Sequence, residues 1–366
     1  RSLYLHGAHD IGHAMQDLML VGCSSFAVWG NKSADGKLLV GRNFDFYAGD
    51  DFAVDKVISF VKPEKGNAFM SVGWPGMIGA VSGMNDRGLT VTINAGKSAI
   101  PLKAKTPISI LTREILQYAS NIEQAIAIAK KSEVFVSESI LVASAEDKKA
   151  VIIEMGPKNF GVYQVPNSAD HLVCSNHFQS ENFADDKRNQ QAIKQSHSQY
   201  RWNKMQEEIE NQPALTPKLA VDILRNTSAV KNGKPLGFGN EKALNQLLAH
   251  HGIVFQPEEL KVWVSANQLG EFVCYDLKEI FQSDKKLIPE NTLSKTIENI
   301  PASAFLQTTE YANYQKFRVQ DKILDTFLKH DLVISDDFID EYLALNPEFW
   351  KSYYKVGLYF YAQKDY

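Results

Sequence analysis

The sequence has few cysteines and no long apolar run, and both shortages exclude classes of protein. Only Cys23, Cys174 and Cys274 occur in 366 residues, which is too few for a disulfide scaffold, and no pair has the C-x-x-C spacing of a zinc site. No apolar run reaches the roughly 18 residues that a membrane-spanning helix needs. We therefore expect a chain that does not span a membrane and does not depend on disulfides for its fold.

Charge of one sign is also missing. The 39 Lys and Arg residues nearly balance 43 Asp and Glu residues, for a net charge of -4, and no basic block is long enough to follow a phosphate backbone. Nucleic acid is therefore not an expected partner. A content of 44% apolar and 22% charged residues is typical of a folded globular protein and excludes a disordered chain.

Most of the chain alternates short strand patterns with helical blocks, which predicts an α+β fold. Asp35-Gly36 is a strong hairpin signal between expected strands at 25–29 and 37–43. We expect one sheet from strands at 54–61, 68–73, 78–82 and 88–95, a second sheet from 139–144, 150–154, 160–165 and 171–175, and a final strand pair at 262–266 and 271–275. Helices are predicted at 107–118, 121–131, 185–210 and 217–225. The pattern suits two packed sheets with helices outside.

The last part of the chain has a different character. Residues 284–301 have the composition of a linker, and Thr308 to His330 has the apolar spacing of an amphipathic helix. Residues 353–366 resemble the first helix of a tetratricopeptide repeat, although the chain ends where the second helix would begin. We expect a small helical appendage.

The clearest chemical signal surrounds Cys23. A tight hairpin would bring Arg42 and Asp45 beside the thiol, and an adjacent cation lowers the pKa of a thiol and favours the nucleophilic thiolate. Two other interpretations remain open from the residues alone. Cys23 can be a small buried apolar residue, or, after Leu20-Val-Gly, a lipid-attachment cysteine, although the preceding residues are too polar for an export signal.

Several ordered motifs resemble the acyl-CoA:6-aminopenicillanic acid acyltransferase family, peptidase family C45, which is related to the choloylglycine hydrolases. They are Gly22–Gly30, Asp35–Asp45, Gly83–Leu89, Ile93–Asn94 and Ser175–Phe178. The resemblance implies an N-terminal nucleophile hydrolase fold, a four-layer αββα sandwich. It also implies three regions: a propeptide-like segment at 1–22, a catalytic domain at 23–283, and a linker with helical appendage at 284–366.

The resemblance further implies that the precursor is a zymogen that cleaves its own Gly22-Cys23 bond. Cys23 would then be the N-terminal nucleophile, and its α-amine, with a reference pKa of about 7.7 to 8.0, would act as its base. Site roles carry over to residues that match the family motifs: Asp45 holds the amine, Arg42 lies beside the thiolate, and Asn94 and Asn176 contact substrate and the developing oxyanion. Arg201 matches a further family arginine.

The expected activity is cleavage or transfer of the acyl group of a linear amide, with no metal or organic cofactor. Phe26, Phe44, Trp74 and Met77 lie near the site motifs and are candidate substrate-binding residues for an apolar acyl group, with Phe46, Tyr47, Phe52, Pro75 and Met84 nearby in sequence. The partner would be a small acyl-amide substrate, with acyl-CoA as a candidate donor. Whether water or an amine takes the acyl group is not encoded in any motif.

Some alternatives compete with this hypothesis. His177 adjoins Asn176, but the mechanism above needs no histidine, so we expect it to be packed or hydrogen-bonded. His6, His9, Asp10 and His13 share a helical face without a further ligand set, and we assign no metal. A different class would be a catalytically idle, lipid-anchored or repeat-containing interaction protein. Because the chain starts at Arg1, we expect something upstream and slightly favour an exported, periplasmic or extracellular location over a cytoplasmic one.

Overall fold

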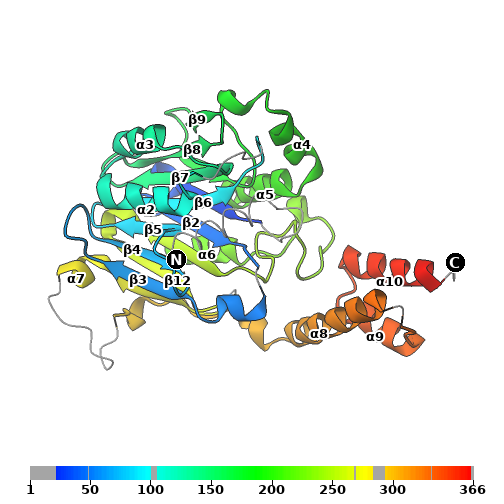
Figure 1. Cartoon of the computed structure of the whole chain (residues 1–366). Coiled ribbons are helices and arrows are strands. Elements are labelled where there is room, and N and C mark those ends of the chain that lie inside the picture. Colours follow the sequence, from blue (N-terminus) through cyan, green and yellow to red (C-terminus); the bar gives the residue numbers. More distant parts are fainter. Residues whose placement is uncertain are drawn as a thin grey trace.

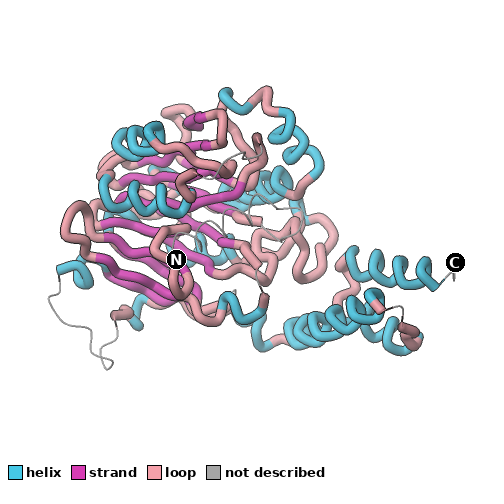
Figure 2. The backbone as a smooth tube through the Cα atoms, viewed as in Figure 1, coloured by secondary structure: helices cyan, strands magenta, loops and turns pink. Residues whose placement is uncertain are grey.

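Two antiparallel sheets form the centre of the structure, a computed structural model that describes residues 22–47, 49–99, 105–267, 269–282, 293–330 and 332–363. The first sheet has the strand order β10-β1-β2-β11-β12-β13 and the second the order β3-β4-β5-β6-β7-β8-β9. Figures 1 and 2 show the strands of both sheets stacked in layers, with helices on the outer faces. The propeptide-like residues 1–21 and the linker residues 283–292 lie outside the described residues.

The first sheet positions the residues around Cys23. Its strands are β1 (Ser24–Val28), β2 (Leu39–Phe44), β10 (His171–Cys174), β11 (His251–Gln256), β12 (Lys261–Ser265) and β13 (Phe272–Asp276). The β1–β2 hairpin turns at Gly36, whose φ of 73° suits glycine, and its register pairs Ser24 with Asn43 and Ser25 with Arg42. Cys23 therefore lies at the start of β1, beside the end of β2.

The second sheet is a continuous series of neighbouring hairpins. Its strands are β3 (Val57–Val61), β4 (Phe69–Gly73), β5 (Ser82–Asn85), β6 (Leu89–Ala95), β7 (Glu138–Ser144), β8 (Lys149–Met155) and β9 (Phe160–Tyr163). Two helices, α2 (Ile108–Tyr118) and α3 (Ile122–Lys131), connect β6 to β7. Asn121 caps α3 by accepting a hydrogen bond from the Gln124 backbone nitrogen.

Three apolar layers hold the sandwich together. Met70, Leu141 and Phe255 belong to the layer between the two sheets. The outer face of the second sheet packs on α2 and α3 through residues such as Ile140 and Leu111. The outer face of the first sheet packs on α5 (Ser198–Asn211) and α6 (Pro217–Leu224). The expected αββα sandwich is confirmed.

Several expected elements differ from the structure. Strands β7 to β9 extend the sheet of β3 to β6 rather than forming their own, and β10 crosses to pair with β1. The expected strand at 78–82 is wrong: β5 begins at Ser82, at the end of that range. The predicted helix at 185–210 is two helices, α4 (Lys187–Gln195) and α5, with Ser196 and His197 between them.

The C-terminal helices form a small unit that packs against the two-sheet sandwich. They are α8 (Thr309–Lys329), α9 (Asp336–Leu345) and α10 (Trp350–Gln363), drawn in orange to red in Figure 1, after the short α7 (Leu277–Gln282). Their apolar cluster includes Leu247, which lies just before β11. Asn346 clamps Phe238, donating to its carbonyl oxygen at 2.9 Å and accepting from its nitrogen at 3.0 Å.

Residues 293–300, which the sequence analysis assigns to the linker, lie along the edge of the first sheet. The Phe272 and Ile300 backbones exchange two hydrogen bonds of 2.9 Å, and Trp263 Nε1 donates to the Glu298 carbonyl oxygen at 2.8 Å. This segment therefore covers part of strand β13, which would otherwise be an edge.

Candidate active site

Cys23 is fully buried where the ends of β1 and β2 meet the second sheet. Its sulfur lies 3.6 Å from Arg42 Nη2, within hydrogen-bond distance for sulfur. The preceding residue is also fixed: the Gly22 nitrogen donates to the Asp45 carbonyl oxygen at 3.0 Å, and the Gly22 oxygen accepts from Gln246 Nε2 at 3.2 Å. Gly22 is therefore held beside the thiol through both its backbone nitrogen and its carbonyl oxygen.

Arg42 is a buried cation whose head group is held by the second sheet. Nη1 donates to the Val81 carbonyl oxygen at 3.2 Å and to the Ser82 hydroxyl, and Nη2 donates to the Ile93 carbonyl oxygen at 2.5 Å. The guanidinium also lies over the Phe44 ring, 4.2 Å from its centroid. These contacts fix the direction in which Arg42 presents its charge to the thiol.

Burial outweighs Arg42 in setting the state of the thiol, contrary to the expectation that Arg42 would bring the pKa toward neutrality. Burial raises the pKa of Cys23 to about 11, the positive charge of Arg42 opposes that rise, and the negative charges of Asp45 and Glu138 add to it. In this uncleaved state the thiol is protonated at neutral pH. Activation therefore needs a base or better solvation of the site.

Asp45 is a buried carboxylate with unused acceptor capacity. It is fully buried, and neither of its carboxylate oxygens has a hydrogen-bond partner among the described residues. Burial raises the pKa of Asp45 to about 7, while the positive charges of Arg201 and Arg42 lower it. An ammonium group placed against these oxygens would satisfy them, because each can accept hydrogen bonds.

Asn94 and Asn176 each bond through both ends of the side-chain amide, and they differ in exposure, because Asn94 is fully buried and Asn176 is half-buried. Both ends of the Asn94 amide are bonded: Oδ1 accepts from Ser25 Oγ at 2.8 Å, and Nδ2 donates to the Cys174 carbonyl oxygen at 3.2 Å. Asn176 is half-buried, and its Nδ2 donates one hydrogen to the Ala95 carbonyl oxygen at 2.9 Å. Its second amide hydrogen is compatible with the predicted oxyanion role.

Arg201 is close enough to the other site residues to act on them. Its Nη2 donates to Asn176 Oδ1 at 2.6 Å, and its Nη1 donates to the Glu241 carbonyl oxygen at 2.7 Å. It also lowers the pKa of Asp45 through its charge. Arg201 therefore holds the Asn176 amide in its observed orientation.

The sequence analysis missed several residues of the site. Glu138, at the start of β7, is fully buried and its charge acts on Cys23. His251, in the unpredicted strand β11, has Nε2 2.8 Å from Ser82 Oγ, and burial holds its pKa well below the usual value. The apolar run after His251 could have indicated β11. Gln246 lies in an irregular segment without any motif.

The candidate substrate-binding residues separate into two layers. Phe44, Trp74 and Met77 pack in the same apolar cluster as Cys23, and the Phe44 and Trp74 rings stack with centroids 6.4 Å apart. Phe26, expected among the substrate-binding residues, lies elsewhere. It packs in the cluster against α5 and α6, on the outer face of the first sheet, where it covers Gly41. Side chains along a strand alternate between faces, which sends Phe26 away from the thiol.

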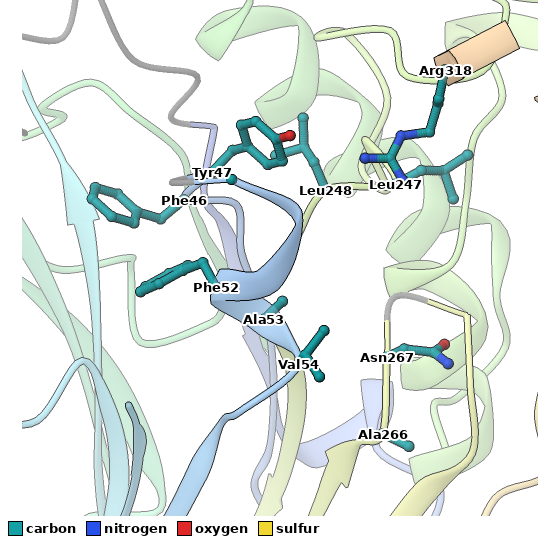
Figure 3. Close-up of a pocket in the computed structure, with 11 residues that line it drawn as sticks. Phe46, Tyr47, Phe52, Ala53, Val54, Leu247, Leu248, Ala266, Asn267 and Arg318 are labelled. Carbon is teal, nitrogen blue, oxygen red and sulfur yellow. The ribbon is translucent and has the colours of Figure 1, made fainter. Parts of the chain in front are cut away.

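A cavity of about 350 Å³ lies between Phe46, Phe52 and neighbouring residues, the Leu247-Leu248 segment, and Arg318 of α8. Figure 3 shows Phe46, Phe52 and Val54 on one side, and Leu247, Leu248 and Arg318 on the other. The Phe46 ring stacks on Phe44 with centroids 5.7 Å apart, and Phe44 lies against the Arg42 guanidinium that contacts the thiol. Its lining is mixed, with apolar side chains beside the polar Tyr47, Asn267 and Arg318.

His177 is packed and hydrogen-bonded, as expected. Its Nδ1 lies 2.7 Å from Ser198 Oγ, and burial together with the charge of Arg201 lowers its pKa to about 4. It is therefore neutral at physiological pH. The residues His6, His9, Asp10 and His13 lie outside the described residues.

The described part of the chain also bears on membrane spans and metal sites. No helix in it is long and apolar enough to cross a bilayer. No group of three or more His, Cys, Asp or Glu side chains in it has the arrangement of a metal site.

A two-sheet αββα sandwich with a thiol at the start of a central strand defines the class of N-terminal nucleophile hydrolase folds. Within that class, the chain belongs to the acyl-coenzyme A:6-aminopenicillanic acid acyl-transferase family, whose model matches residues 31–268. The match begins after Cys23 and includes Arg42, Asp45, Asn94, Asn176 and Arg201. The resemblance inferred from the motifs is confirmed.

Individual relatives are distant. An uncharacterized protein of Archaeoglobus fulgidus is 28% identical over 171 residues, which span 43% of this chain and only 28% of that protein. A Caenorhabditis elegans N-acylethanolamine-hydrolyzing acid amidase ortholog matches with a TM-score of 0.46 and 19% identity, over 64% of this chain and 93% of that one. Penicillin V acylase from Agrobacterium tumefaciens matches with a TM-score of 0.44 and 12% identity, over 72% of this chain and 89% of that one.

Proposed function

We propose that the chain is a cysteine-dependent amidase or acyltransferase that acts on linear N-acyl amides through a Cys23 thioester, after cleaving its own Gly22-Cys23 bond. One observation carries the proposal. The Cys23 sulfur lies 3.6 Å from the buried Arg42 Nη2, while the buried Asp45 carboxylate has no described hydrogen-bond partner. A nucleophile, a fixed cation and an acceptor for an ammonium group are thus within one buried cluster.

Self-cleavage would convert the buried thiol into the N-terminal nucleophile. The Cys23 sulfur attacks the Gly22 carbonyl carbon, and the carbon–nitrogen bond breaks as the nitrogen takes the proton that the thiol gave up. Water then hydrolyses the thioester to a Gly22 carboxylate and a free thiol. The new α-amine would satisfy the Asp45 oxygens and, with a reference pKa of about 7.7 to 8.0, serve as the base for the thiol.

Turnover would repeat the same chemistry on a bound amide. The thiolate attacks the acyl carbon, the α-ammonium protonates the leaving amine, and the acyl group stays on sulfur until water or an acceptor amine takes it. The second Nδ2 hydrogen of Asn176 is the best candidate donor to the oxyanion, and one such donor is worth about 2.7 to 4 kcal/mol in known cases. Arg201 would keep that amide in place.

The apolar surroundings favour an apolar acyl group. Phe44, Trp74 and Met77 pack in the cluster of Cys23, and Phe46 links it to the cavity lined by Phe52. A test panel would pair apolar acyl chains with different amines, beginning with an N-acylethanolamine and penicillin V, the compounds that the names of the two similar structures indicate. An acyl-CoA donor with an amine acceptor would test transfer.

The test is to trap the acyl group on Cys23. Each panel compound is mixed with the purified protein, quenched in acid, and the intact mass is measured. We expect an added acyl mass that hydroxylamine removes, and no adduct on the Cys23→Ala variant. Product formation without any adduct, or an unchanged rate in Cys23→Ala, would contradict the proposal. Lipid found on Cys23 of the purified protein would instead support an anchored interaction protein.

A further inference from the structure

We propose that Gln246 donates the hydrogen bond that stabilises the oxyanion on the Gly22 carbonyl oxygen during self-cleavage of the Gly22-Cys23 bond. This inference rests on the proposed function, because it requires Cys23 to attack Gly22. It assigns a catalytic residue to the maturation step, at a position that lies outside every motif of the sequence.

The contact is direct and buried. Gln246 Nε2 lies 3.2 Å from the Gly22 oxygen, and the Gln246 side chain is only 2% exposed. When the thiol adds to the Gly22 carbon, the carbonyl electron pair moves to this oxygen and leaves it negatively charged. A donor already in place there costs no reorganisation and is worth more in a buried site than in water.

The shape of the contact explains why glycine precedes the nucleophile. A Cβ built on Gly22 would lie 2.2 Å from Gln246 Nε2 and 3.0 Å from its Cδ. The amide therefore lies against the Cα of Gly22, and a side chain at that position would push the amide away from the Gly22 oxygen. The Gly22 nitrogen donates to the Asp45 carbonyl oxygen at 3.0 Å, so Gly22 is held through both its nitrogen and its carbonyl oxygen.

The segment that carries Gln246 is fixed independently of Gly22. Asn245 Nδ2 donates to the Leu224 carbonyl oxygen at 3.2 Å, and its Oδ1 accepts from the Leu247 nitrogen at 2.9 Å. Leu247 has a φ of 56°, an unfavourable left-handed conformation for leucine, and its side chain is buried in the cluster of the C-terminal helices. Gln246 is thus held by its neighbours on both sides.

The experiment follows cleavage of the full-length chain made by cell-free synthesis, with the uncleaved fraction read from intact mass at successive times after translation is stopped. We expect Gln246→Ala to cleave about 100-fold more slowly than wild type, the loss typical of one oxyanion donor. Gln256→Ala is the matched control, because Gln256 is a half-buried glutamine that contacts Asp35 rather than Gly22. It should cleave at the wild-type rate.

The isosteric Gln246→Glu variant separates a donor from a packing role. A protonated glutamic acid can donate a hydrogen bond to the oxyanion, whereas a carboxylate repels it. The ratio of the variant's cleavage rate to the wild-type rate should therefore rise as the pH falls from about 8 toward about 5. This ratio decides the matter even if Gln246→Ala fails to fold. Wild-type rates in both variants, or a ratio independent of pH, would overturn the inference alone. A wild-type chain that stays whole would overturn the proposed function with it.

Discussion

At the scale of single residues, the candidate active site contains two buried ionisable side chains, Arg42 and Asp45, that differ in their hydrogen bonding. Arg42 is paired with carbonyl oxygens, the Ser82 hydroxyl and the Cys23 sulfur, whereas Asp45 has no described hydrogen-bond partner. A buried acceptor without a partner costs free energy. Cleavage would supply an ammonium group there, which makes Asp45 a destabilising residue before cleavage and a stabilising one after it.

Asp45 should make the uncleaved fold sensitive to pH. Its folded pKa of about 7 exceeds the ordinary value of 3.8, so between these values the folded state binds more protons than the unfolded state. Stability from this group is therefore lost as the pH rises through that window. We expect the Cys23→Ala chain to stay whole. In that background, Asp45→Asn should raise the free energy of unfolding at pH 8 by on the order of a few kcal/mol, and with it the melting temperature, and should change both little at pH 4.

Thermal unfolding of Cys23→Ala with and without Asp45→Asn, at both pH values, measures this effect. The same gain at both pH values would show that the Asp45 charge is not what destabilises the uncleaved fold. In the self-cleaving chain we expect Asp45→Asn to slow turnover, because the α-amine loses its carboxylate.

Asn176 and Arg201 test the oxyanion assignment. Arg201→Lys keeps a positive charge but cannot reproduce the two hydrogen bonds, to Asn176 Oδ1 and to the Glu241 carbonyl oxygen. We expect its kcat to fall at least about tenfold with a smaller change in KM. A displaced Asn176 amide would reduce stabilisation of the transition state more than it would reduce substrate binding. Steady-state kinetics on the best panel substrate checks this, and a change confined to KM would contradict it.

At the scale of secondary-structure elements, strand β1 presents Cys23 at its start and Phe26 on the opposite side of the sheet from the thiol. Gly41 leaves room for the Phe26 ring, because a Cβ at that position would lie 2.4 Å from it. Gly41→Ala should therefore destabilise the fold by about 1 to 3 kcal/mol, and adding Phe26→Leu should recover part of that loss. Denaturant unfolding of the two single variants and the double variant measures the coupling.

The same variants test the corrected position of Phe26. Phe26→Leu should lower stability and leave the KM for acyl-amide substrates unchanged, because the side chain packs on α5 and α6. A change in KM without a loss of stability would show that Phe26 contacts the substrate and would contradict this position.

Local patterns predicted what depends on near neighbours in the chain. The Asp35-Gly36 turn and the alternation beside it predicted the β1–β2 hairpin and so the approach of Arg42 to Cys23. Which strands share a sheet depends on long-range pairing, and the assignment of β7 to β9 to their own sheet was therefore wrong. The ionisation of Cys23 was also misjudged, because burial is a property of the whole fold. Gln246 had no local signal.

At the scale of the whole molecule, the C-terminal helices are joined to the segment that contacts the Gly22 carbonyl oxygen. Asn346, on the loop between α9 and α10, clamps Phe238, and Leu247 beside Gln246 belongs to the helices' apolar cluster. The Glu241 carbonyl oxygen in the same segment accepts from Arg201. The appendage thus supports two groups of the candidate active site from a distance.

Asn346→Ala should weaken this support. The variant leaves both Phe238 backbone groups without their partner, at a cost of about 1 to 3 kcal/mol, and should lower the melting temperature and slow self-cleavage several-fold. Gln363→Ala, on the exposed end of α10, is the control and should change neither. Time courses of cleavage and thermal unfolding give both readouts. Normal cleavage in a destabilised Asn346→Ala chain would show that the appendage is independent of the site.

The central claim is that Cys23 is a nucleophile that acts first on its own chain. The most direct test is the intact mass, under reducing and denaturing conditions, of the purified wild-type protein beside its Cys23→Ala variant, followed by N-terminal sequencing. The account predicts a wild-type chain that begins at Cys23 and a variant that remains whole. A wild-type chain with an intact Gly22-Cys23 bond, or cleavage that persists in the variant, would contradict it.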